Sequence, residues 1–104
     1  MRFPIQRALH YRTLNRRAEI VEADGETLNI SSTGILFTSD HQLPIGTRLE
    51  MRIEWPTEVN EKGFSRVMVV RGRVIREHAK GIFALRIKQY KFRIVPSKSM
   101  SQAG

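Results

Sequence analysis

The side chains with the clearest capacity for chemistry are arginines near the start of the chain. A guanidinium group presents a planar set of donors that grips a phosphate or the O6/N7 edge of guanine through two hydrogen bonds, and its flat face stacks on a base. The alternative is that these arginines only keep an exposed strand face in water. Five of the first 17 residues are arginine, with no acidic residue among them: Arg2, Arg7, Arg12, Arg16 and Arg17.

A second set of polar residues lies in one short turn. Asn29, Ser31 and Gly34 form the pattern Asn-x-Ser-x-x-Gly immediately before the apolar residues 35–37. An asparagine amide both donates and accepts hydrogen bonds, a serine hydroxyl does so at short range, and a glycine permits a positive φ or a close approach of its backbone. The alternative interpretation is that these residues only cap an ordinary turn.

The sequence contains no arrangement of residues that is typical of an enzyme or of a metal site. The three histidines lack the spacing of a metal-binding pair and have no neighbouring acidic residues arranged as further ligands. Ser31 and Ser32 are not part of the G-x-S-x-G sequence that presents a serine nucleophile. Glu50 and Glu54 alternate with arginines, as on a solvated strand face with ion pairs. We therefore expect no catalytic residue, no metal ligand and no cofactor.

Length and composition predict one small domain with an anionic partner. The chain has 104 residues, of which 40% are hydrophobic, so it can bury one core. Lys and Arg number 18 against 10 Asp and Glu, and the formal net charge of +8 favours anionic partners. The absence of cysteine excludes disulfides, thiolate metal sites and a cysteine nucleophile. No apolar stretch approaches the roughly 18 residues that cross a bilayer, and we expect a cytoplasmic protein without a membrane span.

Alternating apolar and polar residues predict the strands that position these groups. Residues 49–55 alternate without exception and form the clearest strand. Residues 5–11 also alternate and favour a strand, with an amphipathic helix as the alternative. A bend or bulge is expected at Gly72, where an apolar run is interrupted. The remaining predicted strands are residues 27–30, 35–37, 67–75 and 83–92.

Turns and connectors separate these strands. A polar connector is expected over residues 57–65, and the Ser-rich residues 96–104 are expected to form a disordered tail. About six short strands without a helix predict an all-β fold, a small antiparallel β-barrel that forms one domain over residues 1–95. The predicted turns are Asp24-Gly25, residues 31–34, residues 43–46 and Lys80-Gly81.

The turn and the strands around it resemble the PilZ domain family, whose members are bacterial receptors for cyclic di-GMP. Asn29, Ser31 and Gly34 match the D/N-x-S-x-x-G signature of that family. The resemblance implies a small antiparallel barrel in which an N-terminal R-x-x-x-R segment folds over the ligand while the turn holds it from below. Three later segments extend the likeness over nearly the whole chain: residues 43–47, 72–76 and 83–87.

The arginine pair is where this sequence departs from the family. Arg12 and Arg16 have the R-x-x-x-R spacing, but the family places the pair before the first strand, and Arg12 lies within or at the end of that predicted strand. On the family's register Arg2 resembles the second arginine, and the first would precede Met1. Strand alternation sends Arg7 to the core-facing side. With the motif thus degenerate, the candidate ligand residues are Arg2, Arg12, Arg16, Asn29, Ser31 and Gly34.

The resemblance implies a signalling module that binds cyclic di-GMP and is not an enzyme. The ligand carries two phosphates and two guanines, which arginines would bind together with the amide of Asn29 at a guanine edge. Binding would change the contacts of an unidentified protein effector. One alternative is a degenerate PilZ-like adaptor that acts through protein contacts without a nucleotide. A basic barrel that binds nucleic acid is the less favoured alternative, because most aromatic residues fall on core positions.

Overall fold

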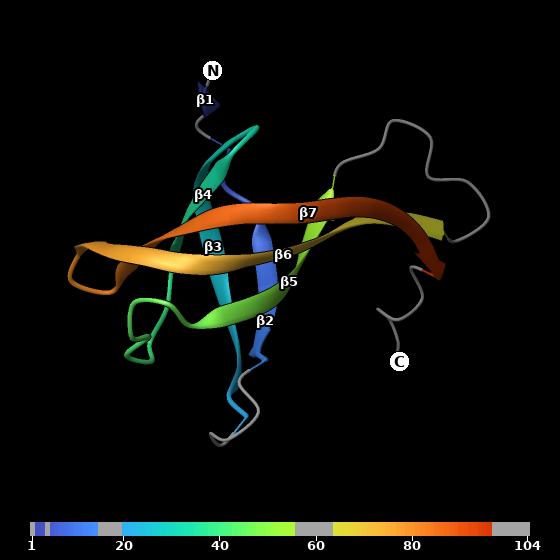
Figure 1. Ribbon diagram of the computed structural model, residues 1–104. Helices are drawn as coiled ribbons and strands as arrows, with labels where there is room; N and C mark the ends of the chain where they lie inside the picture. Colours follow the sequence, from blue (N-terminus) through green and yellow to red (C-terminus); the bar gives the residue numbers. More distant parts are fainter. Residues whose placement is uncertain (1, 4, 15–19, 56–63, 97–104) are drawn as a thin grey trace.

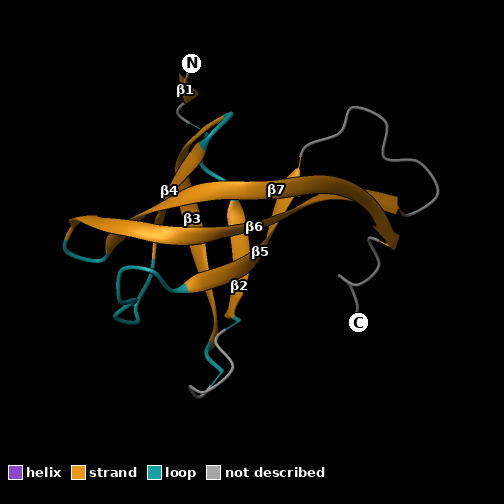
Figure 2. Ribbon diagram, viewed as in Figure 1, coloured by secondary structure: helices purple, strands orange, loops and turns teal. Residues whose placement is uncertain are grey.

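The chain forms seven β-strands and, in the part that is described, no helix. The computed structural model describes residues 2–3, 5–14, 20–55 and 64–96. Residues 8–11 lie in a strand, so the strand interpretation is confirmed there and the helix alternative is wrong. The strands, drawn in Figure 2, are β1 (Arg2–Phe3), β2 (Ala8–Thr13), β3 (Glu22–Ser31), β4 (Gly34–Thr38), β5 (Arg48–Trp55), β6 (Phe64–Ala79) and β7 (Ile82–Pro96).

Six of these strands close into an antiparallel barrel. The strand order in the sheet is β1-β3-β2-β5-β6-β7-β4, and β4 also pairs with β3, which closes the ring. Figure 1 shows β6 and β7 side by side across the molecule, with β2 and β3 running at a steep angle behind them. The predicted all-β barrel is therefore confirmed, and closure gives most of its strands partners on both sides.

β1 and β2 follow one another along the same edge of β3. β1 pairs with the last residues of β3, and β2 pairs with its first half. Thr27 holds the chain between them, because its hydroxyl donates to the main-chain oxygen of Ile5 at 2.6 Å and accepts the N–H of Arg7 at 2.9 Å. The segment that precedes the barrel is thus tied to the end of β3 that carries Asn29 and Ser31.

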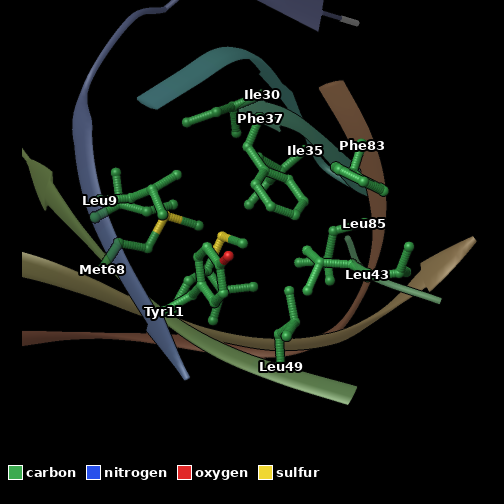
Figure 3. Packing of buried hydrophobic residues seen from close by; sticks show 14 residues of the cluster. Leu9, Tyr11, Ile30, Ile35, Phe37, Leu43, Leu49, Met68, Phe83 and Leu85 are labelled. Carbon is green, nitrogen blue, oxygen red and sulfur yellow. The ribbon is translucent and has the colours of Figure 1, made fainter. Parts of the chain in front are cut away.

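The barrel interior is filled by the inward faces of the strands, as Figure 3 shows. The ring of Phe37 lies between those of Tyr11 and Phe83, with centroid distances of 6.0 and 6.2 Å. The buried hydroxyl of Tyr11 is hydrogen-bonded to Ser39 Oγ at 2.5 Å, so its polar end is satisfied. The core consists of Leu9, Tyr11, Ile30, Ile35, Phe37, Leu43, Leu49, Met51, Ile53, Met68, Val70, Val74, Phe83 and Leu85.

The turn predicted at Asp24-Gly25 is wrong. Both residues lie inside β3, where Asp24 is opposite His10 and Gly25 is opposite Leu9. A Cβ on Gly25 would lie only 2.4 Å from the main-chain oxygen of Thr38. Glycine is therefore required here because another strand approaches closely, and the residue that looked like a turn former allows the barrel to close.

The long hairpin of β6 and β7 is the largest element of the fold. The two strands pair from Phe64 opposite Pro96 to Ala79 opposite Ile82. The register shifts between Arg71 and Gly72, which confirms the predicted bulge at that glycine. Both strands extend beyond the ranges 67–75 and 83–92 that alternation predicted, and Pro96, expected in the tail, is the last residue of β7.

Two other predicted turns are confirmed. Gly46 and Gly81 both have a positive φ, of 96° and 78°, and the N–H of Thr47 donates to the oxygen of Pro44 at 3.1 Å. Residues 57–63 of the predicted connector and residues 97–104 of the predicted tail lie outside the described part of the chain. Within the described ranges, no helix has the length and apolar character needed to span a membrane.

Candidate functional site

The turn between β3 and β4 is built around the hydroxyl group of Ser31. Its oxygen accepts the N–H groups of Thr33 and Gly34 at 3.3 and 3.1 Å, and the hydroxyl lies 3.2 Å from the carbonyl oxygen of Gly34, to which it donates. Ser32 and Thr33 form the exposed bend of the hairpin. The predicted turn is confirmed. Ser31 caps this turn, which is the role given above as the alternative to ligand binding.

An open pocket of about 560 Å³ lies beside this turn, bordered by β3, β4, β6 and β7. Three of the predicted ligand residues, Asn29, Ser31 and Gly34, line it. Arg76 and Arg86 also line it, and none of the described residues around it is acidic. The volume falls within the range of about 300 to 1,000 Å³ that is typical of small-molecule sites. The positive charge of the two arginines favours an anionic ligand.

Asn29 presents a free amide to this pocket. Its side chain is half-buried, and within the described part of the chain it has no hydrogen-bond partner. The amide therefore keeps both its donors and its acceptor for a ligand. Half-buried Leu36 and Ile75 add an apolar surface to the same pocket. The pocket thus offers an amide and an apolar surface that can contact a base, and two guanidinium groups that can bind a phosphate.

Gly34 contributes through close approach and not through a positive φ. The described glycines with a positive φ are Gly46 and Gly81. A Cβ on Gly34 would lie 3.0 Å from the main-chain oxygen of Leu85 in β7. The absence of a side chain thus allows β4 to lie against β7, where Gly34 is opposite Arg86. This pairing brings the Arg86 guanidinium to the turn.

Of the two predicted arginines that the structure describes, Arg2 has its backbone next to the pocket, where it is opposite Ser31. Arg12 is opposite Glu22, nine positions from Ser31 along β3, which corresponds to about 30 Å of strand. Figure 1 shows the same separation, with β1 and the β3–β4 turn at the top and the end of β2 at the bottom. Arg16 lies outside the described residues.

Arg12 belongs instead to an ion-pair cluster on the outer surface. Its Nε donates to one carboxylate oxygen of Glu50 at 3.1 Å, and Nε of Arg71 donates to the other at 3.0 Å. Burial by itself raises the pKa of Glu50, but the hydrogen bonds from Arg71 and Arg12 outweigh it, and the pKa lies below its ordinary value. The ion-paired strand face predicted around Glu50 is confirmed.

Arg7 is half-buried, and its Nε is fully buried without a hydrogen-bond partner among the described residues. Its main-chain oxygen accepts the N–H of Thr27 at 2.9 Å. Arg7 does not line the pocket beside Ser31. The partial burial is consistent with the core-facing direction that alternation predicted for this side chain.

Sequence reasoning missed Arg76, His78 and Arg86, which all line the pocket. Alternation could indicate only that such residues face outward. The register between β6 and β7 shifts twice in this region, once before Arg76 and again after Glu77, so a period of two does not carry across it. The pairing of β4 with β7 decides which outward-facing arginines lie beside the turn. The spacing of these arginines along the chain does not predict this pairing.

Comparison with known protein families gives a match over almost all of the chain. The family model described as PilZ domain matches residues 2–102. No curated protein and no solved structure matches the chain. Among the described residues, no group of three or more His, Asp or Glu side chains is placed to hold a metal ion.

Proposed function

Since the chain belongs to the PilZ domain family, we propose that it is a signalling module that binds cyclic di-GMP and is not an enzyme. The observation that most strongly supports this proposal is the pocket beside the β3–β4 turn. It combines the unpartnered amide of Asn29 with the guanidinium groups of Arg76 and Arg86 and has no acidic residue in its described lining. A ligand with two phosphates and two guanines needs both kinds of group.

Each group has a distinct task in the proposed complex. The amide of Asn29 pairs with a guanine edge, to which it both donates and accepts. Arg86 and Arg76 neutralise the phosphates, and Leu36 and Ile75 lie against a base. Ser31 keeps the turn in shape through its three hydrogen bonds.

Arg2 is the N-terminal arginine that this arrangement favours, because β1 holds it opposite Ser31. The ligand would fix the segment around Arg2 against the barrel and so change the surface that a protein effector contacts. A bidentate arginine contact discriminates by roughly 1 to 3 kcal/mol. The loss of such a contact therefore weakens binding by about 5- to 150-fold.

Isothermal titration calorimetry with cyclic di-GMP tests the proposal. We expect saturable binding that Asn29→Ala and Arg86→Ala weaken strongly, since each removes a group that lines the pocket. Arg12→Ala is the matched control, because it removes an arginine that is bound to Glu50 and lies away from the pocket. No heat with ligand at tens of micromolar, from a protein with an intact circular dichroism spectrum, would rule out cyclic di-GMP as the ligand.

A PilZ-like adaptor that acts without a nucleotide is the second candidate. It is favoured by the position of Arg12, which lies in an ion pair on another part of the surface and so does not complete an arginine pair at the pocket. A folded protein that gives no heat with cyclic di-GMP and that captures the same protein partner with and without the nucleotide would select this function.

A further inference from the structure

The second half of β7 forms an open edge of the sheet. β7 pairs with β4 through residues 82–86, and the N–H of Ile87 donates to the main-chain oxygen of Thr33 at 2.8 Å. Beyond Ile87, β6 is the one strand that pairs with β7 in the described part of the chain. Figure 1 shows β7 continuing past β4 alongside β6. Residues 88–95, which we call the free edge, therefore have no strand partner on their other side among the described residues.

One face of the free edge is apolar. Tyr90, Phe92 and Ile94 occupy alternate positions on the face of β7 that continues the barrel interior, since Tyr90 is opposite buried Val70. Their side chains are nevertheless exposed, by 54%, 45% and 62%. We call these three residues the apolar row. Three large apolar side chains in succession on one strand face form a surface of the kind that binds another protein.

Neighbouring side chains hold the apolar row in place. The ring of Phe92 lies edge-on to the rings of Trp55 and Tyr90, at centroid distances of 5.3 and 6.2 Å. The guanidinium carbon of Arg66 lies 5.9 Å from the centre of the same ring. These contacts restrict the rings before any partner binds, so a partner loses less conformational entropy when it covers them.

The opposite face of the free edge is cationic. β7 contains four basic residues and no acidic residue. Lys91 and Arg93 alternate with the apolar row and lie on the outer face, where they line a hollow of about 440 Å³ together with Arg52 and Arg71. Glu50 is the one acidic residue among the described residues that line this hollow, and it is already bound by Arg71. The outer face therefore attracts acidic groups.

We propose that the free edge binds an extended acidic segment of a partner protein, which adds to the sheet as a further strand. The partner strand alternates apolar and acidic residues, so that its apolar side chains lie beside the apolar row and its carboxylates lie beside Lys91 and Arg93. Main-chain hydrogen bonds along the edge provide affinity, and the two faces provide specificity.

Two other partners fit this surface less well. A second copy of β7 would bring the cations of two edges together, and like charges on adjacent strands oppose pairing. Nucleic acid would match the cations, but it has no peptide groups for the edge, and the apolar row lies on the opposite face from Lys91 and Arg93. An acidic strand is the partner that uses the edge, the cations and the apolar row together.

This interaction is separate from nucleotide binding. The pocket beside Ser31 is lined on β7 by residues 84–86, and none of the free edge lines it. The proposal therefore does not rest on cyclic di-GMP as the ligand, and the two can fail independently.

Fluorescence anisotropy with a labelled peptide of about eight residues that alternates glutamate and valine tests the proposal. Two further peptides carry N-methyl groups on the valine amides or on the glutamate amides. One of these should bind at least about tenfold more weakly than the other, because alternate amides of a strand face opposite edges. Equal binding by all three peptides would overturn the proposal, as would equal competition by oligothymidylate, because the surface would then attract any polyanion.

Hydrogen exchange locates the added strand on the protein. The peptide should slow the exchange of amides within residues 88–95 and leave those of β2 unchanged, because an added strand protects the edge with which it pairs. Protection that falls on other strands would overturn the proposal. A peptide-free protein that forms dimers with the same amides protected would also overturn it, since the edge would then belong to a second copy.

Variants of exposed side chains test the two faces separately. Lys91→Glu should weaken binding of the glutamate–valine peptide at least about threefold, because an attraction becomes a repulsion. Phe92→Ala should weaken it by a similar factor, because the centre of the apolar row is lost. The matched controls are Lys80→Glu in the β6–β7 turn and Ile45→Ala in another exposed turn, and both should bind as the wild type does. Equal affinity of all four variants would overturn the proposal.

Discussion

Replacement of Gly25 by alanine is expected to destabilise the barrel by about 2 to 3 kcal/mol. The new Cβ would lie 2.4 Å from the main-chain oxygen of Thr38, whereas ordinary contacts begin near 3.4 Å. One of the two strands must therefore move by about 1 Å. Overpacking typically costs about 1 to 3 kcal/mol, and the upper half applies here because the obstructing atom belongs to the backbone and cannot rotate away.

A shift of Thr38 would also affect a hydrogen bond between β3 and β4, the pair of strands that closes the barrel. The N–H of Glu26, next to Gly25, donates to the hydroxyl of Thr38 at 3.0 Å. A shift of Thr38 would lengthen this bond. The methyl group of alanine at position 25 would therefore also weaken the contact between β3 and the end of β4.

Urea unfolding followed by the fluorescence of Trp55, the one tryptophan of the chain, measures the effect. With a slope of about 1 to 2 kcal/mol per molar urea, the midpoint should fall by about 1 to 3 M. Gly46→Ala is the control, because no atom lies within 4 Å of its new Cβ and only its φ of 96° opposes the change. A loss below about 1 kcal/mol for Gly25→Ala, as expected for a residue in an open turn, would refute the close-approach reasoning.

Three further outcomes follow from polar contacts. The pKa of His10 is raised, first by its 2.9 Å hydrogen bond to Asp24, with burial opposing and a second carboxylate assisting. The stabilisation that protonated His10 provides is complete below the ordinary pKa of 6.5 and is lost as the pH rises through the folded-state value. The urea midpoint of the wild-type protein should therefore fall as the pH rises above 6.5, and that of His10→Gln should fall less steeply. The pKa of Glu50 is lowered, so its contribution is present above the ordinary value of 4.5 and is lost as the pH falls through the folded-state value; Glu50→Gln should therefore lose less stability on acidification, and an unchanged acid titration would contradict this. Tyr11→Phe removes the 2.5 Å hydrogen bond to Ser39 and should cost about 1 kcal/mol by calorimetry, whereas an unchanged melting temperature would show that the bond contributes nothing.

Local periodicity and turn chemistry were sufficient to predict the fold class and one half of the candidate site. The alternation in residues 49–55 predicted β5 because inward and outward side chains follow a period of two wherever a strand is regular. The Asn-x-Ser-x-x-Gly pattern predicted the β3–β4 turn because a serine hydroxyl bonds to main-chain groups within three residues of itself. Both signals are contained in fewer than ten consecutive residues, so they can be recognised without knowledge of the rest of the chain.

Residue patterns along the chain were thus enough to predict an all-β fold, its main strands and the polar turn, whereas the residues that meet this turn depend on how distant strands pair. Arg86 reaches the pocket through the pairing of β4 with β7, and Arg12 is held on another surface by Glu50. Gly25 lies inside β3, where the backbone of Thr38 approaches it closely, and not in a turn. Each of these outcomes depends on register between strands that are distant in the chain and on bulges that shift it. A pattern within one strand carries no information about its partner.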